Sequence, residues 1–156
     1  MIANILAAIL MAAAQPLPPG PPPVTIEQLR FAFTTQSGSD TVYFAGDSFG
    51  LDLSAQRTLA AQARWLRANP MISVRIEGHS DDRFTRDHAL ALGERRADAV
   101  RDFLVLQGVP SAQISIISWG KERPQANGGA QSRAVTMLMP LSPVPPLVPP
   151  GPAPVL

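Results

Sequence analysis

The chain has 156 residues, which is enough for one domain with its own core and too few for two domains of ordinary size. Its 13 basic and 12 acidic side chains give a formal net charge of +1, so overall charge provides no basis for nucleic-acid binding. The sequence has no cysteine, which excludes disulfides and thiolate metal sites and leaves no cysteine to carry a lipid anchor.

The two ends differ in composition from the middle. Residues 1–14 are almost entirely apolar, are too few for the roughly 20 residues of a membrane span, and end in small residues that resemble a signal-peptide cleavage site. We therefore expect a signal peptide there and export of the chain; an uncleaved anchor and a misassigned start are the alternatives. Residues 15–28 and 141–156 are rich in proline, which fixes φ and lacks an amide donor, so we expect a linker and a tail around a domain at 29–140.

The domain begins with a strand-like pattern. Leu29, Phe31 and Phe33 alternate with polar or small residues, a period typical of a strand. Residues 37–40 have the composition of a turn, and residues 41–44 are expected to form the next strand.

A helix is predicted next, with Ser54 as a candidate N-cap. Leu59, Ala63 and Leu66 share one face of this helix, and Asn69-Pro70 is expected to end it.

The second half of the domain is predicted to contain three further strands and one long helix. Ile72, Val74 and Ile76 alternate with polar residues, which predicts a half-buried strand. A polar loop from Gly78 to about Phe84 is followed by a long helix, two strands and the loop between them. In order, these are a helix ended by Gly108 and Pro110, a strand at 114–118, a loop at 121–131 and a strand at 134–139.

The element order from residue 41 onward is strand, helix, strand, helix, strand, strand. It predicts an α/β fold, an α+β sandwich in which the helices pack on one face of a mixed sheet. Each crossover through a helix is expected to join neighbouring parallel strands.

Arg96 lies where the long helix should be apolar. At about 100° per residue it falls roughly 40° from Leu92, inside the stripe that Ala99 and Phe103 share. A buried guanidinium needs a partner, and Asp81 and Asp82 lie in the preceding loop. Two interpretations follow: Arg96 pairs with Asp81 or reaches solvent for structural reasons, or the acid and the arginine together bind a zwitterionic ligand.

Several segments resemble the OmpA-like domain family, and most closely its peptidoglycan-associated lipoprotein branch. The resemblance extends over about residues 41–139 and rests on Val42-Tyr43-Phe44, Gly78-His79-Ser80-Asp81-Asp82-Arg83, Leu92-Gly93-Glu94-Arg95-Arg96-Ala97, Trp119-Gly120-Lys121-Glu122-Arg123-Pro124 and Arg133-Ala134-Val135.

The resemblance implies a βαβαββ sandwich that binds the peptide stem of peptidoglycan non-covalently. In the family, the residues that match Asp81 and Arg96 grip diaminopimelate, whose extra ammonium and carboxylate suit an acid and an arginine. It also implies a place in the periplasm or at the outer membrane, with the Tol system or outer-membrane proteins as further partners. The full candidate ligand set is Asp81, Arg96, His79, Asp82, His88 and Arg133.

The chain departs from the family pattern around this set. Phe84 stands where the family has glycine, which permits φ > 0, and His88-Ala89 replaces a tyrosine and an asparagine. Gln131 and Ser132 replace an Asn-Arg pair before Arg133, and Ala45-Gly46 replaces an acid and an aromatic residue. A degenerate module that serves as a spacer or protein-interaction domain is therefore the alternative function.

An enzymatic function has less support. His79, Asp81, Asp82 and His88 are potential metal ligands within a short span, but the sequence has no H-E-x-x-H motif. We expect no catalytic residue, metal or cofactor.

Overall fold

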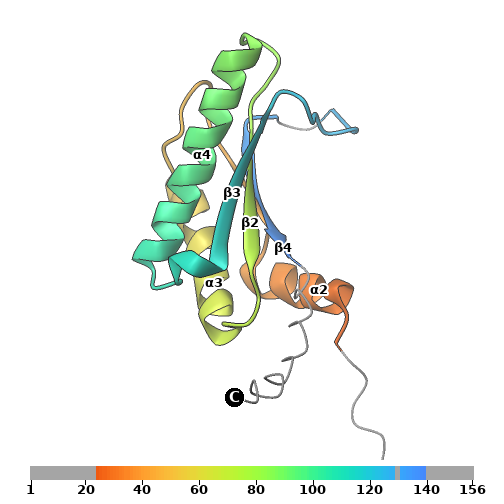
Figure 1. Cartoon of the computed structure of the whole chain (residues 1–156), viewed down its shortest axis with the longest axis vertical. Coiled ribbons are helices and arrows are strands. Elements are labelled where there is room, and N and C mark those ends of the chain that lie inside the picture. The colour runs from red at the N-terminus through yellow and green to blue at the C-terminus, as the bar shows by residue number, and fades with distance from the viewer. Residues whose placement is uncertain (1–23, 129–130, 140–156) are drawn as a thin grey trace, which may run out of the picture.

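The computed structural model describes residues 24–128 and 131–139 (Figure 1). The expected signal peptide and tail, and most of the expected linker, lie outside the described residues. The elements are α2 (Ile26–Ser37), β1 (Thr41–Tyr43), α3 (Leu53–Ala68), β2 (Val74–His79), α4 (Arg86–Leu106), the 3-10 helix η1 (Ser111–Gln113), β3 (Ile114–Gly120) and β4 (Arg133–Leu138).

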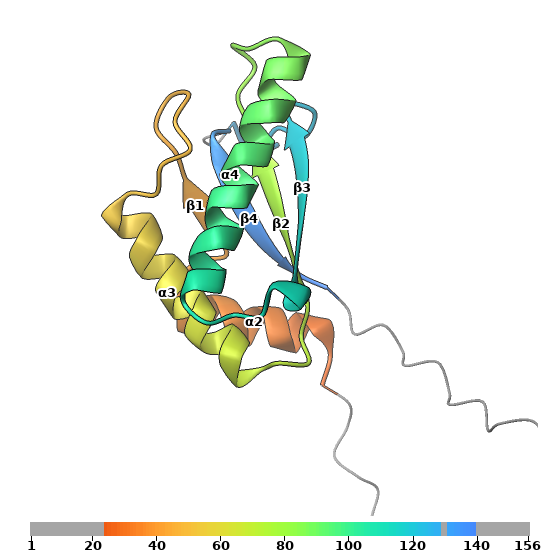
Figure 2. The same ribbon diagram turned by 60° about the vertical axis from the view of Figure 1, so that its left-hand side comes forward.

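The four strands form one mixed sheet in the order β1-β4-β2-β3. β2 and β3 are parallel, and β4 runs antiparallel to both β1 and β2. Helices α3 and α4 lie together in front of the sheet in Figure 2, which confirms the predicted fold class. The predicted neighbour relationship was wrong for the first crossover, because β4 inserts between β1 and β2.

The segment with alternating phenylalanines is a helix and not a strand. Thr25 and Gln28 form a reciprocal capping box at the start of α2, which satisfies amides that a helix end leaves free. Phe33 is buried while Phe31 is 74 % exposed, so one helical face carries the packing. The ring of Phe33 meets Trp65 of α3 edge-on, with 5.1 Å between the ring centroids. Helix α2 therefore packs against α3 and also contacts β4 at one end of the sheet (Figure 1).

The N-cap of helix α3 lies two residues before the predicted cap. Its N-cap is Asp52, whose Oδ1 accepts a hydrogen bond from the Ala55 amide at 2.7 Å, and Ser54 already lies inside the helix. The predicted end at Asn69 is confirmed. Leu59, Ala63 and Leu66 are all buried, as the shared face predicts.

The two candidate caps separate in a stability measurement. We expect Asp52→Ala to lower the free energy of unfolding by about 1 kcal/mol, because an orphan amide loses its acceptor. Ser54→Ala should change it by less than about 0.5 kcal/mol, since no helix-end amide depends on that side chain. Urea unfolding of both variants checks the difference, and an equal loss in the two would contradict the Asp52 cap.

Helix α4 lies directly against the end of β2. A Cβ atom placed on Gly78 would stand 1.7 Å from the carbonyl oxygen of Gly93, so no side chain fits at this crossing. β2 also continues through Gly78 and His79, which the sequence assigned to a loop. The close approach places the N-terminal half of α4 beside the loop that follows β2.

Candidate ligand-binding site

Three segments that are far apart in the sequence meet at one end of the sheet. Asp81 follows β2, Arg96 lies on α4, and the loop at 44–50 joins β1 to α3. Figure 2 shows this loop, in orange, toward the same end of the molecule as the first turns of α4. Hydrogen bonds from Arg96 to this loop tie the segments together.

Arg96 is completely buried and is held by backbone carbonyls. Its Nε donates to Ser48 O at 3.0 Å, Nη1 to His79 O at 2.8 Å and Nη2 to Gly46 O at 2.7 Å. The guanidinium carbon also lies 5.3 Å from the centre of the Phe44 ring. The burial predicted from the helical pattern is therefore confirmed, but the partners in this structure are neutral oxygens and not a carboxylate.

Burial lowers the pKa of the Arg96 guanidinium, and the nearby negative charge of Asp81 opposes that change. Three carbonyls use three of the five N–H groups of an arginine, which leaves two further donors on the terminal nitrogens. The loop that covers them, residues 45–50, is exposed throughout.

Asp81 pairs with a neighbour in its own loop. Its Oδ2 accepts a 2.9 Å hydrogen bond from Arg83 Nε and also contacts Arg83 Nη2. The hydrogen bonds from the Arg83 side chain lower the pKa of this carboxyl, and burial opposes them. Ser132 Oγ lies 3.5 Å from both Asp81 Oδ2 and Gly46 O, so it stands between the acid and the carbonyl that binds Arg96.

Two other predicted site residues, Asp82 and His88, are exposed to solvent. The His88 ring stacks on Phe84, with 4.6 Å between centroids and 31° between planes. Phe84 does not adopt the glycine-like backbone that the family pattern led us to expect, because no non-glycine residue in the described ranges has a positive φ. The side chains of Phe84 and His88, which both depart from the family pattern, therefore contact each other, and neither residue strains the backbone.

His79 and Arg133 lie mainly outside this cluster. The β2–β4 register places Gly78 and Ala134 toward α4, so the side chains of His79 and Arg133 project from the opposite face of the sheet. Arg133 is buried there and donates to Gln131 Oε1 at 3.0 Å and Arg123 O at 3.2 Å. His79 contributes its carbonyl oxygen to Arg96 but not its imidazole.

The His79 imidazole is 3 % exposed, and burial followed by the charge of Arg133 lowers its pKa from 6.5 to about 4. Glu77, whose Oε2 is 3.9 Å from His79 Nε2, opposes the shift but does not reverse it. The ring is therefore neutral at pH 7.

This shift predicts a pH-dependent stability. A His whose pKa is lower in the folded than in the unfolded state adds stability above the unfolded value near 6.5, and this stability is lost as the pH falls toward 4. The free energy of unfolding should fall by about 3 kcal/mol between pH 7 and pH 4, on the order of the linkage for that shift. Urea unfolding at several pH values measures it, with His79→Gln as the control that should lack this step. The same pH slope in both proteins would contradict the prediction.

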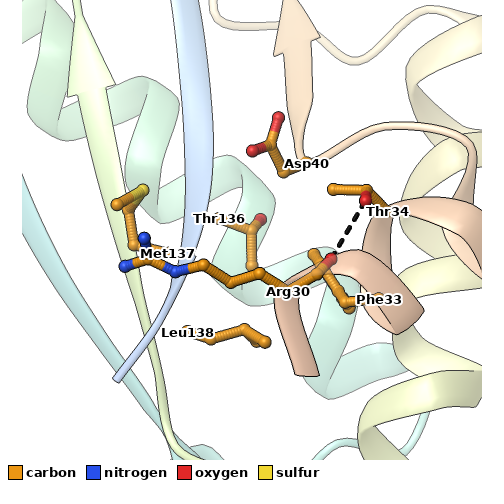
Figure 3. Close-up of a pocket in the computed structure, with 7 residues that line it drawn as sticks. All are labelled: Arg30, Phe33, Thr34, Asp40, Thr136, Met137 and Leu138. Atoms are coloured by element: carbon orange, nitrogen blue, oxygen red, sulfur yellow. Dashed lines mark hydrogen bonds between the residues drawn. The ribbon is translucent and has the colours of Figure 1, made fainter. Parts of the chain in front are cut away.

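One groove near the N-terminal half of α4 includes a candidate residue, His88. It has a volume of about 330 Å³ and is lined by Asp47, Phe49, His88, Ala91, Leu92 and Arg95. The hollow in Figure 3 is only about 80 Å³ and lies between α2 and β4, where Arg30 extends past Met137 and Thr34 bonds the Arg30 carbonyl. Of these two hollows, only the first is lined by a candidate site residue.

Sequence reasoning missed the parts of the site that come from the backbone and from short polar side chains. The carbonyls of Gly46 and Ser48 leave no side-chain signal, and Ser132 was noted only as a departure from a pattern. The sequence signal of an unusual loop backbone was the glycine at position 46, and in the structure Gly46 adopts φ 53°. Within the described ranges, no three His, Asp or Glu side chains are grouped closely enough to hold a metal ion.

The fold is a two-layer α/β domain with an acid and a buried arginine at one end of its sheet. A sequence model of the OmpA family matches residues 43–136, and the chain belongs to that family. None of the helices in the described part is both long and apolar enough to cross a membrane.

Curated relatives carry the name peptidoglycan-associated lipoprotein. The one from Brucella melitensis is 47 % identical over 112 residues, which cover 68 % of this chain and 66 % of the relative. The one from Agrobacterium fabrum is 49 % identical over 94 residues, 60 % of this chain and 52 % of the relative. The chain thus spans between half and two thirds of the length of these relatives.

A solved structure agrees with the sequence comparisons. The peptidoglycan-associated lipoprotein from Burkholderia pseudomallei superposes with a TM-score of 0.61 at 36 % identity. The match covers 65 % of this chain and 92 % of that one.

Proposed function

We propose that this domain binds peptidoglycan non-covalently in the bacterial envelope, at the outer membrane or in the periplasm. Membership of the OmpA family and the names of the relatives support this function. The observation that carries it is the convergence of Asp81 and Arg96, joined through Ser132 and Gly46, at one end of the sheet.

In this proposal the ligand is the diaminopimelate of the peptide stem. Its side-chain ammonium binds Asp81, and its side-chain carboxylate reaches the two donors of Arg96 that the carbonyls leave unused. Because Arg96 is buried, the exposed loop at 45–50 has to move for that contact to form. Asp47 and Arg95 of the adjacent groove would line the path of the stem.

A second candidate function is favoured by one observation. Arg96 is closed off and Asp81 is already paired, as expected of a domain that has lost the ligand and serves as a spacer or binds other envelope proteins. The Tol system and outer-membrane proteins are partners of this kind.

Co-sedimentation with purified sacculi separates the two functions. The full chain should pellet with sacculi and stay in solution without them, whereas Asp81→Asn should lose at least about tenfold in affinity, as expected for a charge-assisted contact. Asp87→Asn, an exposed acid in the first turn of α4, removes the same charge nearby and should bind like the parent. If the folded parent stays in solution with sacculi, the result would contradict peptidoglycan binding and favour the second candidate function.

A further inference from the structure

The acid of the proposed site is occupied by a side chain from its own loop. Arg83 reaches back two residues and donates from Nε and Nη2 to the same oxygen of Asp81, Oδ2. Its backbone amide also donates to Asp81 Oδ1 at 3.3 Å. A guanidinium thus occupies the position that the ligand's ammonium takes in the proposed function.

Arg83 is also placed so that it can leave. Its side chain is 62 % exposed, while that of Asp81 is 18 % exposed, so the arginine can turn to solvent and the acid cannot. Its guanidinium carbon lies 5.6 Å from the centre of the Phe84 ring, which in turn stacks on His88. The Phe84 contact belongs to the conformation in which Arg83 is paired with Asp81.

We propose that Arg83 is a tethered competitor that occupies Asp81 in the free protein and that a ligand must displace, so that Arg83 lowers the affinity of the site for every ligand of Asp81. This inference rests on the proposed function. A ligand's ammonium has to break the Arg83 pair before it can bind Asp81, so part of the free energy of that contact is lost to the displacement. Every ligand that binds Asp81 is weakened by the same factor. A ligand with a second contact, such as a carboxylate at Arg96, therefore keeps measurable affinity when a simple amine does not.

The test is a calorimetric titration of the full chain and two variants with two tripeptides. One peptide is L-alanyl-γ-D-glutamyl-meso-diaminopimelate, and the other has lysine in place of diaminopimelate. The variants are Arg83→Ala and a matched control, Arg86→Ala, which removes an equally exposed arginine that pairs with Glu122. The pKa of the Asp81 carboxyl, followed by NMR without ligand, reports whether Arg83 holds it.

We expect Arg83→Ala to bind the diaminopimelate peptide about 3- to 10-fold more tightly than the parent, which corresponds to losing one partly exposed ion pair. The lysine peptide should gain by the same factor, since its ammonium displaces the same side chain. Arg86→Ala should match the parent, and the Asp81 pKa should rise in Arg83→Ala. Binding by Arg83→Ala when the parent does not bind would support the inference in its strongest form.

Other results overturn it. If the parent binds and Arg83→Ala binds equally or less tightly, Arg83 is not a competitor, although the proposed function stands. An equal gain in Arg86→Ala assigns the effect to net charge alone. If neither the parent nor Arg83→Ala binds while the Asp81 pKa still rises, the ion pair exists but the proposed function fails, and the competitor role fails with it.

Discussion

Gly78→Ala is expected to lower the free energy of unfolding by at least about 3 kcal/mol, enough to leave a marginally stable domain largely unfolded. The added Cβ would stand 1.7 Å from the carbonyl oxygen of Gly93 and 2.6 Å from its carbonyl carbon. Both are backbone atoms of α4, so no side chain can rotate away. The helix has to move off the sheet, and the buried residues Ile76, Ala97 and Val100 lose packing with it.

The control is Gly50→Ala. The nearest atom to a Cβ there is the hydroxyl oxygen of Ser48 at 3.4 Å, an ordinary contact. We expect a change within about 0.5 kcal/mol. Urea unfolding followed by circular dichroism compares the two variants, and comparable stability of Gly78→Ala and the parent would show that the helix is not in contact with β2.

Arg96→Met is expected to cost about 2–4 kcal/mol, because three carbonyls lose a charged donor. Two of the three, Gly46 and Ser48, belong to the exposed loop, and water can replace part of what they lose. The loss should therefore be largest in that loop, where amide hydrogen exchange at residues 45–50 should accelerate. Arg96→Lys should fall between Met and the parent, since an ammonium lacks the planar fork.

The matched control for this prediction is Arg95→Met. Arg95 is exposed, and its guanidinium carbon lies 5.6 Å from the centre of the Phe49 ring, so its loss should cost less than about 1 kcal/mol. Equal effects of the two substitutions on unfolding and on exchange would contradict the structural role of Arg96. Because this role is coupled to folding, Asp81→Asn is the cleaner substitution for testing ligand binding.

The parts of the fold that followed from sequence are those in which one element packs on a single partner. The alternation from Ile72 to Ile76 and the apolar stripe of α4 each reflect burial against one layer, and both correspond to observed elements. Helix α2 was misassigned because Leu29, Phe31 and Phe33 have a period of two by coincidence. The Thr25–Gln28 capping box was the signal that favoured a helix.

Trp65 shows how one wrong element affects the next. It lies off the face that α3 turns to the sheet, so its environment does not follow from the helical pattern. It is 5 % exposed because α2 packs on that side and places Phe33 against it. The insertion of β4 between β1 and β2 was equally invisible, because local periodicity carries no information about which strands become neighbours.

The sequence likewise predicted some features of the candidate site and not others. A charge inside an apolar stripe singled out Arg96, and its complete burial agrees with that pattern. Its partners could not be inferred, because they are carbonyl oxygens of residues with no distinctive side chain. Nor could the sequence separate Asp81 as a partner of Arg96 from Asp81 as a partner of Arg83, which lies only two residues away.

The most direct test of the central claim compares two cell walls. Sacculi that contain meso-diaminopimelate and sacculi that contain lysine at the same position of the stem differ in one carboxylate, the group assigned to Arg96. The account predicts that the full chain pellets with the diaminopimelate sacculi and remains in solution with the lysine sacculi. Equal pelleting with both would contradict recognition of diaminopimelate by Asp81 and Arg96.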